Sequence, residues 1–290
     1  MFLQILYWSK VNALQKENVM KKCIKVIASM LAALSCASLA SCGGDKKKTV
    51  TIGYTDYEPM NYTDANGKLV GFDTELAEKV FGELGYKVRF KLIEWSNKYA
   101  EVDSGTIDCI WNGFTANCAD DDGIQRSAKV DFSYYYMTNA QCVIRLNTSP
   151  ELVSASEFDG KSVAYEGGSA ADSYMADVIE KNSTINVNTK EVTAQMDAVL
   201  EVNAGTAQYA VIDLLLANSI AGKGDFTNIA INESIVIEAE YYAIGFKKGS
   251  ELTAKVNEKL LAYAKDGSLK ALADKYKLSN QVILNYDDQK

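Results

Sequence analysis

The order of apolar and polar positions from residue 49 onward predicts a first set of strands and helices. Thr49–Tyr54 is rich in β-branched side chains and predicts a strand. Apolar side chains recur every three or four positions in Phe72–Leu84, which predicts a helix closed by Gly85. The pattern continues with a strand at Lys87–Ile93, a helix at Ser96–Ser104 and a strand at Ile107–Trp111. This β-α-β-α-β order predicts a mostly parallel sheet with ligand chemistry at the carboxyl ends of its strands.

The same order restarts in the second half of the chain. Its predicted elements are a strand at Ser162–Tyr165, a helix after Gly167-Gly168-Ser169 that runs through Ile179, a strand near Ile185–Asn188, a helix at Val192–Val202 and a strand at Tyr209–Ile212. Two apolar extended segments, Ala140–Leu146 and Tyr241–Phe246, follow the two units, and a helical stretch at Glu251–Tyr276 comes last. Two crossovers favour an α/β fold with two lobes and two hinge strands. A simple two-domain chain would need one linker, and the sequence has no Pro- or Ser-rich linker.

The residues before the first predicted strand have the pattern of a bacterial lipoprotein export signal. Lysines at 21, 22 and 25 precede an apolar run, Val26–Leu39, which is too short for a typical spanning helix. Leu39-Ala40-Ser41-Cys42 resembles a lipobox, in which Cys42 becomes the lipidated first residue of the mature protein. The alternative is a cleaved signal with an incidental cysteine. We take Met20 as the true translation start.

These patterns predict a division of the chain into five parts. Residues 1–41 are expected to be an upstream extension and signal peptide, and residues 42–48 a lipid-anchored tether. Lobe I is expected at 49–142, lobe II at 143–243, and a return to lobe I at 244–290, where the C-terminal helices pack on the first lobe.

Composition excludes several classes of function. Residues 1–41 contain five lysines and one glutamate, which leaves 25 basic and 37 acidic residues and a net charge of −12 in the remaining chain. A nucleic-acid partner is therefore not expected. The sequence has no histidine, which excludes Ser-His-Asp and Cys-His catalysis and the His-containing zinc sites.

Three cysteines remain beyond the signal and the predicted lipidation site. Cys109 and Cys142 lie in apolar runs and are expected to be small buried hydrophobic residues, while a disulfide, if one forms, is expected to use Cys118. The spacing of the cysteines matches no metal motif. Asp120-Asp121-Asp122-Gly123 lacks the later glutamate of an EF-hand loop, so we expect a solvated turn and no metal or other cofactor.

A set of short motifs resembles a known family. They are Gly53-Tyr54-Thr55-Asp56-Tyr57-Glu58-Pro59-Met60-Asn61-Tyr62, Asn66-Gly67-Lys68-Leu69-Val70-Gly71-Phe72-Asp73, Ser104-Gly105-Thr106-Ile107-Asp108, Trp111-Asn112-Gly113-Phe114-Thr115, Arg126, Asp131-Phe132-Ser133, Gly168-Ser169 and Asp213. Their order is similar to that of the polar amino acid-binding proteins of ABC importers, the family 3 bacterial extracellular solute-binding proteins. The resemblance covers residues 49–280 and implies a type II periplasmic-binding-protein-like fold with the ligand cleft between the lobes.

The resemblance implies partners for both charged groups of a free amino acid. Arg126 is similar to the family's arginine that holds the ligand carboxylate, helped by backbone N–H groups near Thr115 and Ser169, each expected to precede a helix. Asp213 is similar to the aspartate that accepts the ligand ammonium, helped by a carbonyl near Gly113 and by the Thr115 hydroxyl. The alternatives are a surface ion pair between Arg126 and Asp120–Asp122, and a helix-capping role for Asp213.

Other residues are expected to shape the space for the ligand side chain. Tyr57 and Trp95 match positions where the family places aromatic walls, although aromatic residues at such spacing also occur simply as core. Trp95, Asn112, Glu166 and the loop Asp56–Glu58 are expected to decide which side chain fits, and the acidic residues favour a ligand with hydrogen-bond donors, basic or amide.

The chain departs from the family pattern at three places. Residues 116–125 hold extra residues between Thr115 and the arginine, the loop after Gly53 is about one residue short, and Ala170 replaces a hydroxyl residue that often follows Gly-Ser. The extra residues bear on the placement of Arg126, and Ala170 removes one contact to the ligand carboxylate.

The expected function is that of an extracytoplasmic, lipid-anchored and monomeric receptor with no catalytic residues. It captures a polar amino acid by hinge closure and delivers it to an ABC permease and its ATPase at the outer face of the cytoplasmic membrane. One alternative is an enzyme on the same scaffold, a cyclohexadienyl or arogenate dehydratase-like protein in which Asp56, Glu58 or Glu166 acts as general acid. The other is a ligand-sensing module that reports to a separate receptor.

Overall fold

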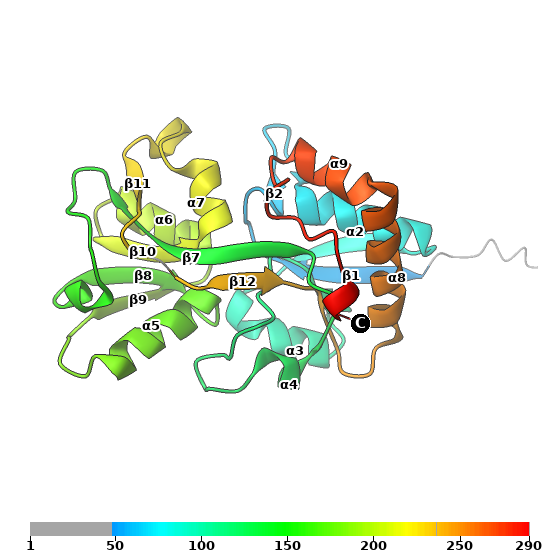
Figure 1. Ribbon diagram of the computed structural model, residues 1–290, viewed down its shortest axis with the longest axis horizontal. Coiled ribbons are helices and arrows are strands. Elements are labelled where there is room, and N and C mark those ends of the chain that lie inside the picture. Colours follow the sequence, from blue (N-terminus) through cyan, green and yellow to red (C-terminus); the bar gives the residue numbers. More distant parts are fainter. Residues whose placement is uncertain (1–47, 236, 290) are drawn as a thin grey trace, which may run out of the picture. The chain divides into compact units, whose positions relative to one another are not determined.

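The computed structural model describes residues 48–235 and 237–289 of the chain (Figure 1). These residues form two α/β lobes, each built on its own sheet. The predicted export signal, the lipidation site Cys42 and all but the last residue of the predicted tether lie outside the described residues. Within the described ranges, no helix combines the length and apolar character needed to span a bilayer.

The first sheet combines strands from both ends of the described chain. In spatial order they are β4 (Lys87–Leu92), β1 (Thr49–Tyr54), β5 (Cys109–Ile110), β13 (Gly245–Phe246) and β6 (Asp131–Phe132). β1 pairs in parallel with β4 and β5, as the β-α-β pattern predicts, whereas β13 runs antiparallel to β5 and β6. The sheet is therefore mixed, because β13, its last strand in chain order, enters after the chain returns from the other lobe.

Helices pack on this sheet, and they bury the apolar faces that the spacing of their residues predicts. α2 (Phe72–Glu83) buries Leu76, Val80 and Phe81, which recur at helical spacing. α8 (Glu251–Asp266) and α9 (Ser268–Lys275) pack against α2, and Lys259 Nζ lies 2.8 Å from Glu83 Oε2. The remaining elements are the strands β2 (Tyr62–Thr63) and β3 (Leu69–Val70), the helices α3 (Lys98–Asp103) and α4 (Arg126–Lys129), and the 3₁₀ helices η1 (Trp95–Asn97) and η4 (Asp287–Gln289).

The second sheet has the spatial order β11, β7, β10, β8, β9. The bounds are β7 (Met137–Leu146), β8 (Ser162–Glu166), β9 (Asn188–Val192), β10 (Tyr209–Asp213) and β11 (Ile229–Asn232). β10, β8 and β9 are parallel, and β7 runs antiparallel to β10 and β11. The α-helices described in this lobe are α5 (Ala170–Lys181), α6 (Gln195–Asn203) and α7 (Leu214–Ile220), and the short 3₁₀ helices are η2 (Ala155–Phe158) and η3 (Gly224–Phe226). The parallel strands bring the last residues of β8 and β10 to the same edge of the sheet.

Two neighbouring strands connect the lobes. β7 pairs with β12 (Ala239–Tyr242) in an antiparallel register from Met137–Tyr242 to Ala140–Ala239, and Figure 1 shows them side by side between the two sheets. The chain leaves the first sheet through β7 and returns through β12 to β13. This pair corresponds to the two predicted hinge strands.

Several predicted boundaries are wrong in detail. The strand expected at Ile185–Asn188 is β9 at Asn188–Val192, because this edge strand is largely polar and its apolar residues precede it. The segment Tyr241–Phe246 is split between β12 and β13, since the chain changes sheets at residues 243–244. The final helical stretch is two helices, separated by Gly267 with φ +82°.

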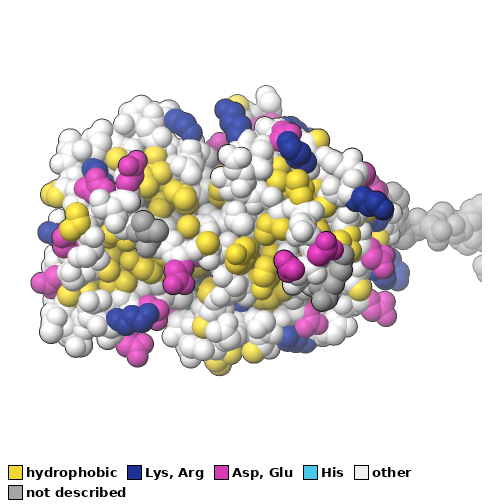
Figure 2. All heavy atoms as spheres, in the orientation of Figure 1, with side chains coloured by type: hydrophobic (Ala, Val, Ile, Leu, Met, Phe, Trp, Pro, Cys, Tyr) yellow, Lys and Arg dark blue, Asp and Glu magenta, His cyan; other side chains and the backbone are white. Residues whose placement is uncertain are grey.

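Charged side chains are dispersed over the face of the molecule drawn in Figure 2. On this face of the described residues, Lys and Arg occur as separate groups among Asp and Glu, with uncharged side chains, backbone and clusters of apolar side chains between them. A continuous basic surface of the kind that binds nucleic acid is not present there.

Candidate functional site

Polar side chains from both lobes meet at the edge where β8 and β10 end. Glu166 is the last residue of β8 and Asp213 the last residue of β10. They face a small cavity of about 10 Å³, roughly the space that one water molecule needs. Its lining residues are Trp95, Asn112, Gly113, Thr115, Arg126, Glu166, Ser169, Ala170, Gln195 and Asp213. The structure therefore brings seven of the eight predicted ligand-binding residues to one place, and Tyr57 is the exception.

A larger hollow lies next to this cavity. It has a volume of about 600 Å³ and is bordered by the loop at 117–121, by α5 and by residues 237–240. Ala170 borders both spaces. The small side chain at this position, where the family often has a hydroxyl residue, thus lies between the two spaces.

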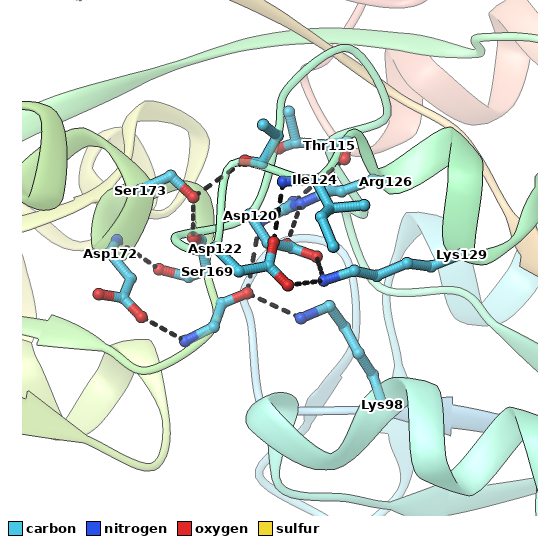
Figure 3. Close-up of polar contacts among 12 residues, drawn as sticks. Lys98, Thr115, Asp120, Asp122, Ile124, Arg126, Lys129, Ser169, Asp172 and Ser173 are labelled. Carbon is cyan, nitrogen blue, oxygen red and sulfur yellow. Dashed lines mark hydrogen bonds and ion pairs between the residues drawn. The ribbon is translucent and has the colours of Figure 1, made fainter.

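Arg126 is buried and bonded on three sides (Figure 3). Its Nε donates to Asp120 Oδ1 at 2.8 Å, and its terminal nitrogens donate to the Thr115 carbonyl at 3.1 Å and the Gly168 carbonyl at 3.3 Å. Arg126 is only 1% exposed, so the pair with Asp120 is not the surface ion pair considered as an alternative. Both charges are nevertheless paired, because the extra loop residues carry Asp120 to the arginine.

Asp120 also holds a second cation. Lys129 Nζ lies 2.8 Å from Asp120 Oδ2 and 2.8 Å from Asp122 Oδ2. Burial by itself would raise the pKa of Asp120, but Arg126 and Lys129 lower it below its ordinary value. The acidic turn therefore belongs to an ion-pair network with α4.

Lys98 is a buried cation that sequence reasoning missed. It is 1% exposed, and its Nζ donates to the Gly168 carbonyl at 2.7 Å and lies 4.6 Å from the centre of the Tyr99 ring. Burial and the neighbouring charge of Arg126 lower the pKa of Lys98 to about 7. A lysine in an amphipathic helix is ordinarily read as exposed, so its sequence carries no signal of this burial. Lys98 and Arg126 thus converge on one carbonyl of the opposite lobe (Figure 3).

Ser169 and Thr115 differ in their local structure. Ser169 caps α5, and its hydroxyl accepts from the N–H of Ala171 at 3.1 Å, which confirms the predicted helix start. Thr115 does not precede a helix, so that prediction is wrong. It forms an isolated bridge with Tyr242, and its hydroxyl donates to Glu240 Oε2 at 3.0 Å. The following residues make a loop that delays the next helix until Arg126.

Asp213 accepts hydrogen bonds from three amide side chains. Asn139 Nδ2 lies 2.7 Å and Gln141 Nε2 2.5 Å from Asp213 Oδ1, and Gln195 Nε2 donates to Oδ2. Asp213 occupies the N-cap position of α7, but its side chain makes no capping bond, and Leu215 N–H donates to Asn139 instead. The capping alternative is therefore wrong.

Two further carboxyl groups lie near Asp213. Glu240, on β12, accepts from Thr115, Asn139 and Gln141 through Oε2. Burial and the nearby Asp213 raise the pKa of Glu240 to about 7. The same two causes raise the pKa of Glu166 well above its ordinary value. Asn139, Gln141, Gln195 and Glu240 were not predicted as site residues, because no motif marks them.

The remaining predicted residues belong to lobe I, and of its two predicted aromatic walls one lines the cavity and the other does not. Trp95 lines the cavity and meets Phe114 edge to face with ring centroids 5.3 Å apart. Tyr57 does not line the cavity and lies in the core, where its hydroxyl is 2.7 Å from that of Tyr242. Among the predicted specificity residues, Asp56 and Glu58 are exposed and do not line the cavity.

Asn112 and Gly113 shape the floor of the cavity. The Asn112 amide bonds to Thr55 and Asn61 within the same lobe, with contacts of 2.7 to 3.0 Å. Gly113 has φ +56°, and an added Cβ would lie 2.6 Å from the Tyr57 ring. Its N–H donates to the buried Asp73 at 2.9 Å. The Gly113 amide and the Asn112 side chain are thus already engaged within the protein.

The three cysteines of the described residues are free. Cys109 and Cys142 are buried, as predicted, and Cys118 is partly exposed beside the larger hollow. No group of three or more Cys, Asp or Glu side chains suited to a metal ion occurs within the described ranges.

Known proteins resemble this chain in sequence. The arginine-binding extracellular protein ArtP of Bacillus subtilis is 25% identical, with 87% of this chain and 97% of the relative covered. The L-cystine-binding protein TcyA of the same organism is 27% identical over the same shares of the two chains.

A solved structure resembles it in fold. An ancestral arginine-binding protein bound to arginine superposes with a TM-score of 0.70 at 27% identity, covering 79% of this chain and 97% of that protein. Residues 50–279 match the family described as bacterial extracellular solute-binding proteins, family 3. The two-lobe fold, the motif order and this match agree, and the chain belongs to that family.

Proposed function

We propose that this protein is the substrate-binding lipoprotein of an ABC importer for a polar amino acid. The observation that carries the proposal is the pairing of opposite charges along one cavity. Arg126 and Asp213 both line it. Lys98 donates to the same Gly168 carbonyl as Arg126, and Glu240 shares the amide donors of Asn139 and Gln141 with Asp213. A free amino acid presents a carboxylate and an ammonium, and both must be paired when a cleft closes over them.

The cationic side is suited to a ligand carboxylate. Arg126 and Lys98 donate to the Gly168 carbonyl, which is a neutral acceptor. A carboxylate is a stronger acceptor for both cations, and a guanidinium can bind it through two parallel bonds. The start of α5 at Ser169 favours an anion at the same place.

The acidic side is suited to the ligand ammonium. Asp213 is surrounded by neutral amide donors, so its negative charge is solvated but has no cationic partner within ion-pair distance among the described residues. An ammonium group supplies that partner. The Thr115 hydroxyl and the Gly113 carbonyl are the neighbouring groups that complete its hydrogen bonds.

Closure of the lobes traps the ligand. The contacts of Gly168 with Lys98 and Arg126 join the lobes, as does the bond from Ser173 Oγ to the Ala119 carbonyl at 3.0 Å. The cavity between them is far smaller than ordinary ligand pockets of several hundred Å³. An amino acid therefore enters only when these contacts break and the lobes separate about β7 and β12, and binding shifts the equilibrium between open and closed forms.

Membership of a family of extracellular solute-binding proteins supports a location outside the cytoplasm. We propose that Cys42 carries the lipid that holds it at the outer face of the cytoplasmic membrane, where a monomer delivers its ligand to the permease and ATPase. A fatty-acid label incorporated by the unmodified protein and lost in Cys42→Ala supports this anchor. Equal labelling of both proteins contradicts it.

A thermal-shift screen of the purified protein tests the binding function. The ligands are the twenty amino acids, cystine, ornithine and prephenate, and a ligand at a hundred times its dissociation constant stabilises by about 2.7 kcal/mol. Stabilisation by one or a few amino acids supports the receptor. Stabilisation by prephenate alone, followed by its turnover, would support the dehydratase-like enzyme instead.

A further inference from the structure

Glu166 has a buried oxygen that the protein leaves without a partner. The residue ends β8, lines the cavity and is 2% exposed. Its Oε1 has no hydrogen-bond partner among the described residues. A buried carboxyl oxygen that lacks a donor is unfavourable, and a donor supplied by a bound molecule removes that cost.

The charges around the cavity are unequal. Arg126 is paired with Asp120, so its charge is already balanced by the protein. Glu166, Asp213 and Glu240 remain, and Lys98, which donates to the Gly168 carbonyl, is the other buried cation among the described residues. None of the three carboxyl groups lies within ion-pair distance of a Lys or Arg in the described residues. A ligand with no net charge leaves this excess of acid unchanged, whereas a cationic ligand reduces it.

The strand geometry places two of these carboxyl groups next to each other. β8 and β10 are neighbouring parallel strands, with Tyr209 opposite Val163 and Ala210 opposite Ala164. Glu166 and Asp213 therefore end adjacent strands at one edge of the sheet. Asp213 has three amide donors, while Glu166 Oε1 has none. The two groups are suited to two separate cationic groups of one ligand.

We infer that the site selects an amino acid with a cationic side chain, and that Glu166 binds the side-chain ammonium or guanidinium while Asp213 binds the α-ammonium. This inference rests on the proposed function and specifies its substrate class. Trp95 shares the cavity wall with Glu166 and provides apolar surface for the methylene groups of such a side chain.

Calorimetric titration with pairs of matched ligands tests the inference on the unmodified protein. Arginine is compared with citrulline, which has nearly the same shape without the charge, and lysine with norleucine. We expect at least one cationic ligand to bind about 30-fold or more tightly than its neutral counterpart, the lower range for a buried charge pair. Equal or tighter binding of both neutral counterparts would overturn the inference and leave the amino-acid receptor intact.

The variant Glu166→Gln identifies the residue responsible. We expect it to weaken binding of the cationic ligand about tenfold or more and to change citrulline binding by less than about threefold, since only the charge pair is lost. Glu233→Gln makes the same chemical change at an exposed turn and should alter neither. Equal affinity of Glu166→Gln and the unmodified protein for arginine or lysine would overturn the role of Glu166. Failure of every amino acid to bind would overturn the proposed function itself.

Discussion

The two sides of the cavity satisfy their charges in different ways. On the cationic side, Asp120 and Asp122 from the loop at 116–125 balance Arg126 and Lys129 within lobe I. Arg126 and Lys98 also donate across to the Gly168 carbonyl. The acidic side lies on strand ends and hinge strands, where neutral amides surround Asp213 and Glu240. The first side thus holds the lobes together without a ligand, whereas the second lacks a cation until a ligand supplies one.

The largest effect is expected from breaking the cationic side. Arg126→Ala leaves Asp120 buried with only Lys129 as a partner and removes the proposed carboxylate clamp, at a cost of about 2 to 5 kcal/mol. We expect ligand binding to fall below detection in calorimetry and the melting temperature to drop. Arg89→Ala, an exposed arginine on β4, is the matched control. Near-normal affinity in Arg126→Ala would contradict the assignment of this site.

A smaller effect is expected from removing the charge on the acidic side. Asp213→Asn keeps the shape, and the surrounding amides can turn to meet it, so we expect affinity to fall by about 2 kcal/mol with little change in melting temperature. Asp213→Ser provides a capping hydroxyl for α7 without a carboxylate. If Asp213→Asn lowered the melting temperature and Asp213→Ser did not, the structural role of Asp213 would be helix capping.

The pH dependence of stability separates the two sides further. Glu240 has a pKa of about 7 in the folded protein against an ordinary value of 4.5, owing to burial and to Asp213. Between these values the folded state holds a proton that the unfolded state has released, so this group lowers stability as pH rises from about 4.5 to about 7. The stability of Glu240→Gln relative to the unmodified protein should therefore increase between about pH 4.5 and about pH 7 and stay constant above that range. Denaturant unfolding at a series of pH values measures the difference, and a constant offset would contradict it.

Lys98 is expected to act in the opposite direction and at higher pH. Its pKa is about 7 when folded and 10.5 ordinarily, because burial and Arg126 disfavour its charge, while Asp120 and Glu166 partly offset them. Between these values the unfolded state holds the additional proton, so stability from this group rises with pH above about 7. In Lys98→Met this increase of stability with pH should be absent. The same unfolding series, extended to pH 10, checks this effect, and parallel curves for the two proteins would refute it.

Much of the fold was predictable because it depends on local periodicity. The apolar spacing in α2 and the hydroxyl cap of α5 at Ser169 are local features, and each predicts its helix from about a dozen neighbouring residues. The strand β9 was misplaced because an edge strand needs few apolar side chains, and the pairing Ser162–Asn188 decides its register.

The site was predictable only where a motif marks it. Arg126, Ser169 and Asp213 were found through their resemblance to a family, and the structure places them around one cavity. Lys98, Gln195 and Glu240 carry no such mark, since a lysine, glutamine or glutamate in an amphipathic element ordinarily faces solvent. The extra loop at 116–125 was visible in the sequence, but the role of Asp120 in it was not.

The sequence by itself determined the order of elements, the two-lobe plan and the family. Only the tertiary structure decided which charges meet: Lys98 with Gly168 across 70 positions, and Gln141 with Glu240 across 99. Periodicity along the sequence predicts which face of a helix or strand is buried. The choice of partner depends on which strand ends and loops the fold brings together, and there residue types that are ordinarily exposed become buried partners in one polar site.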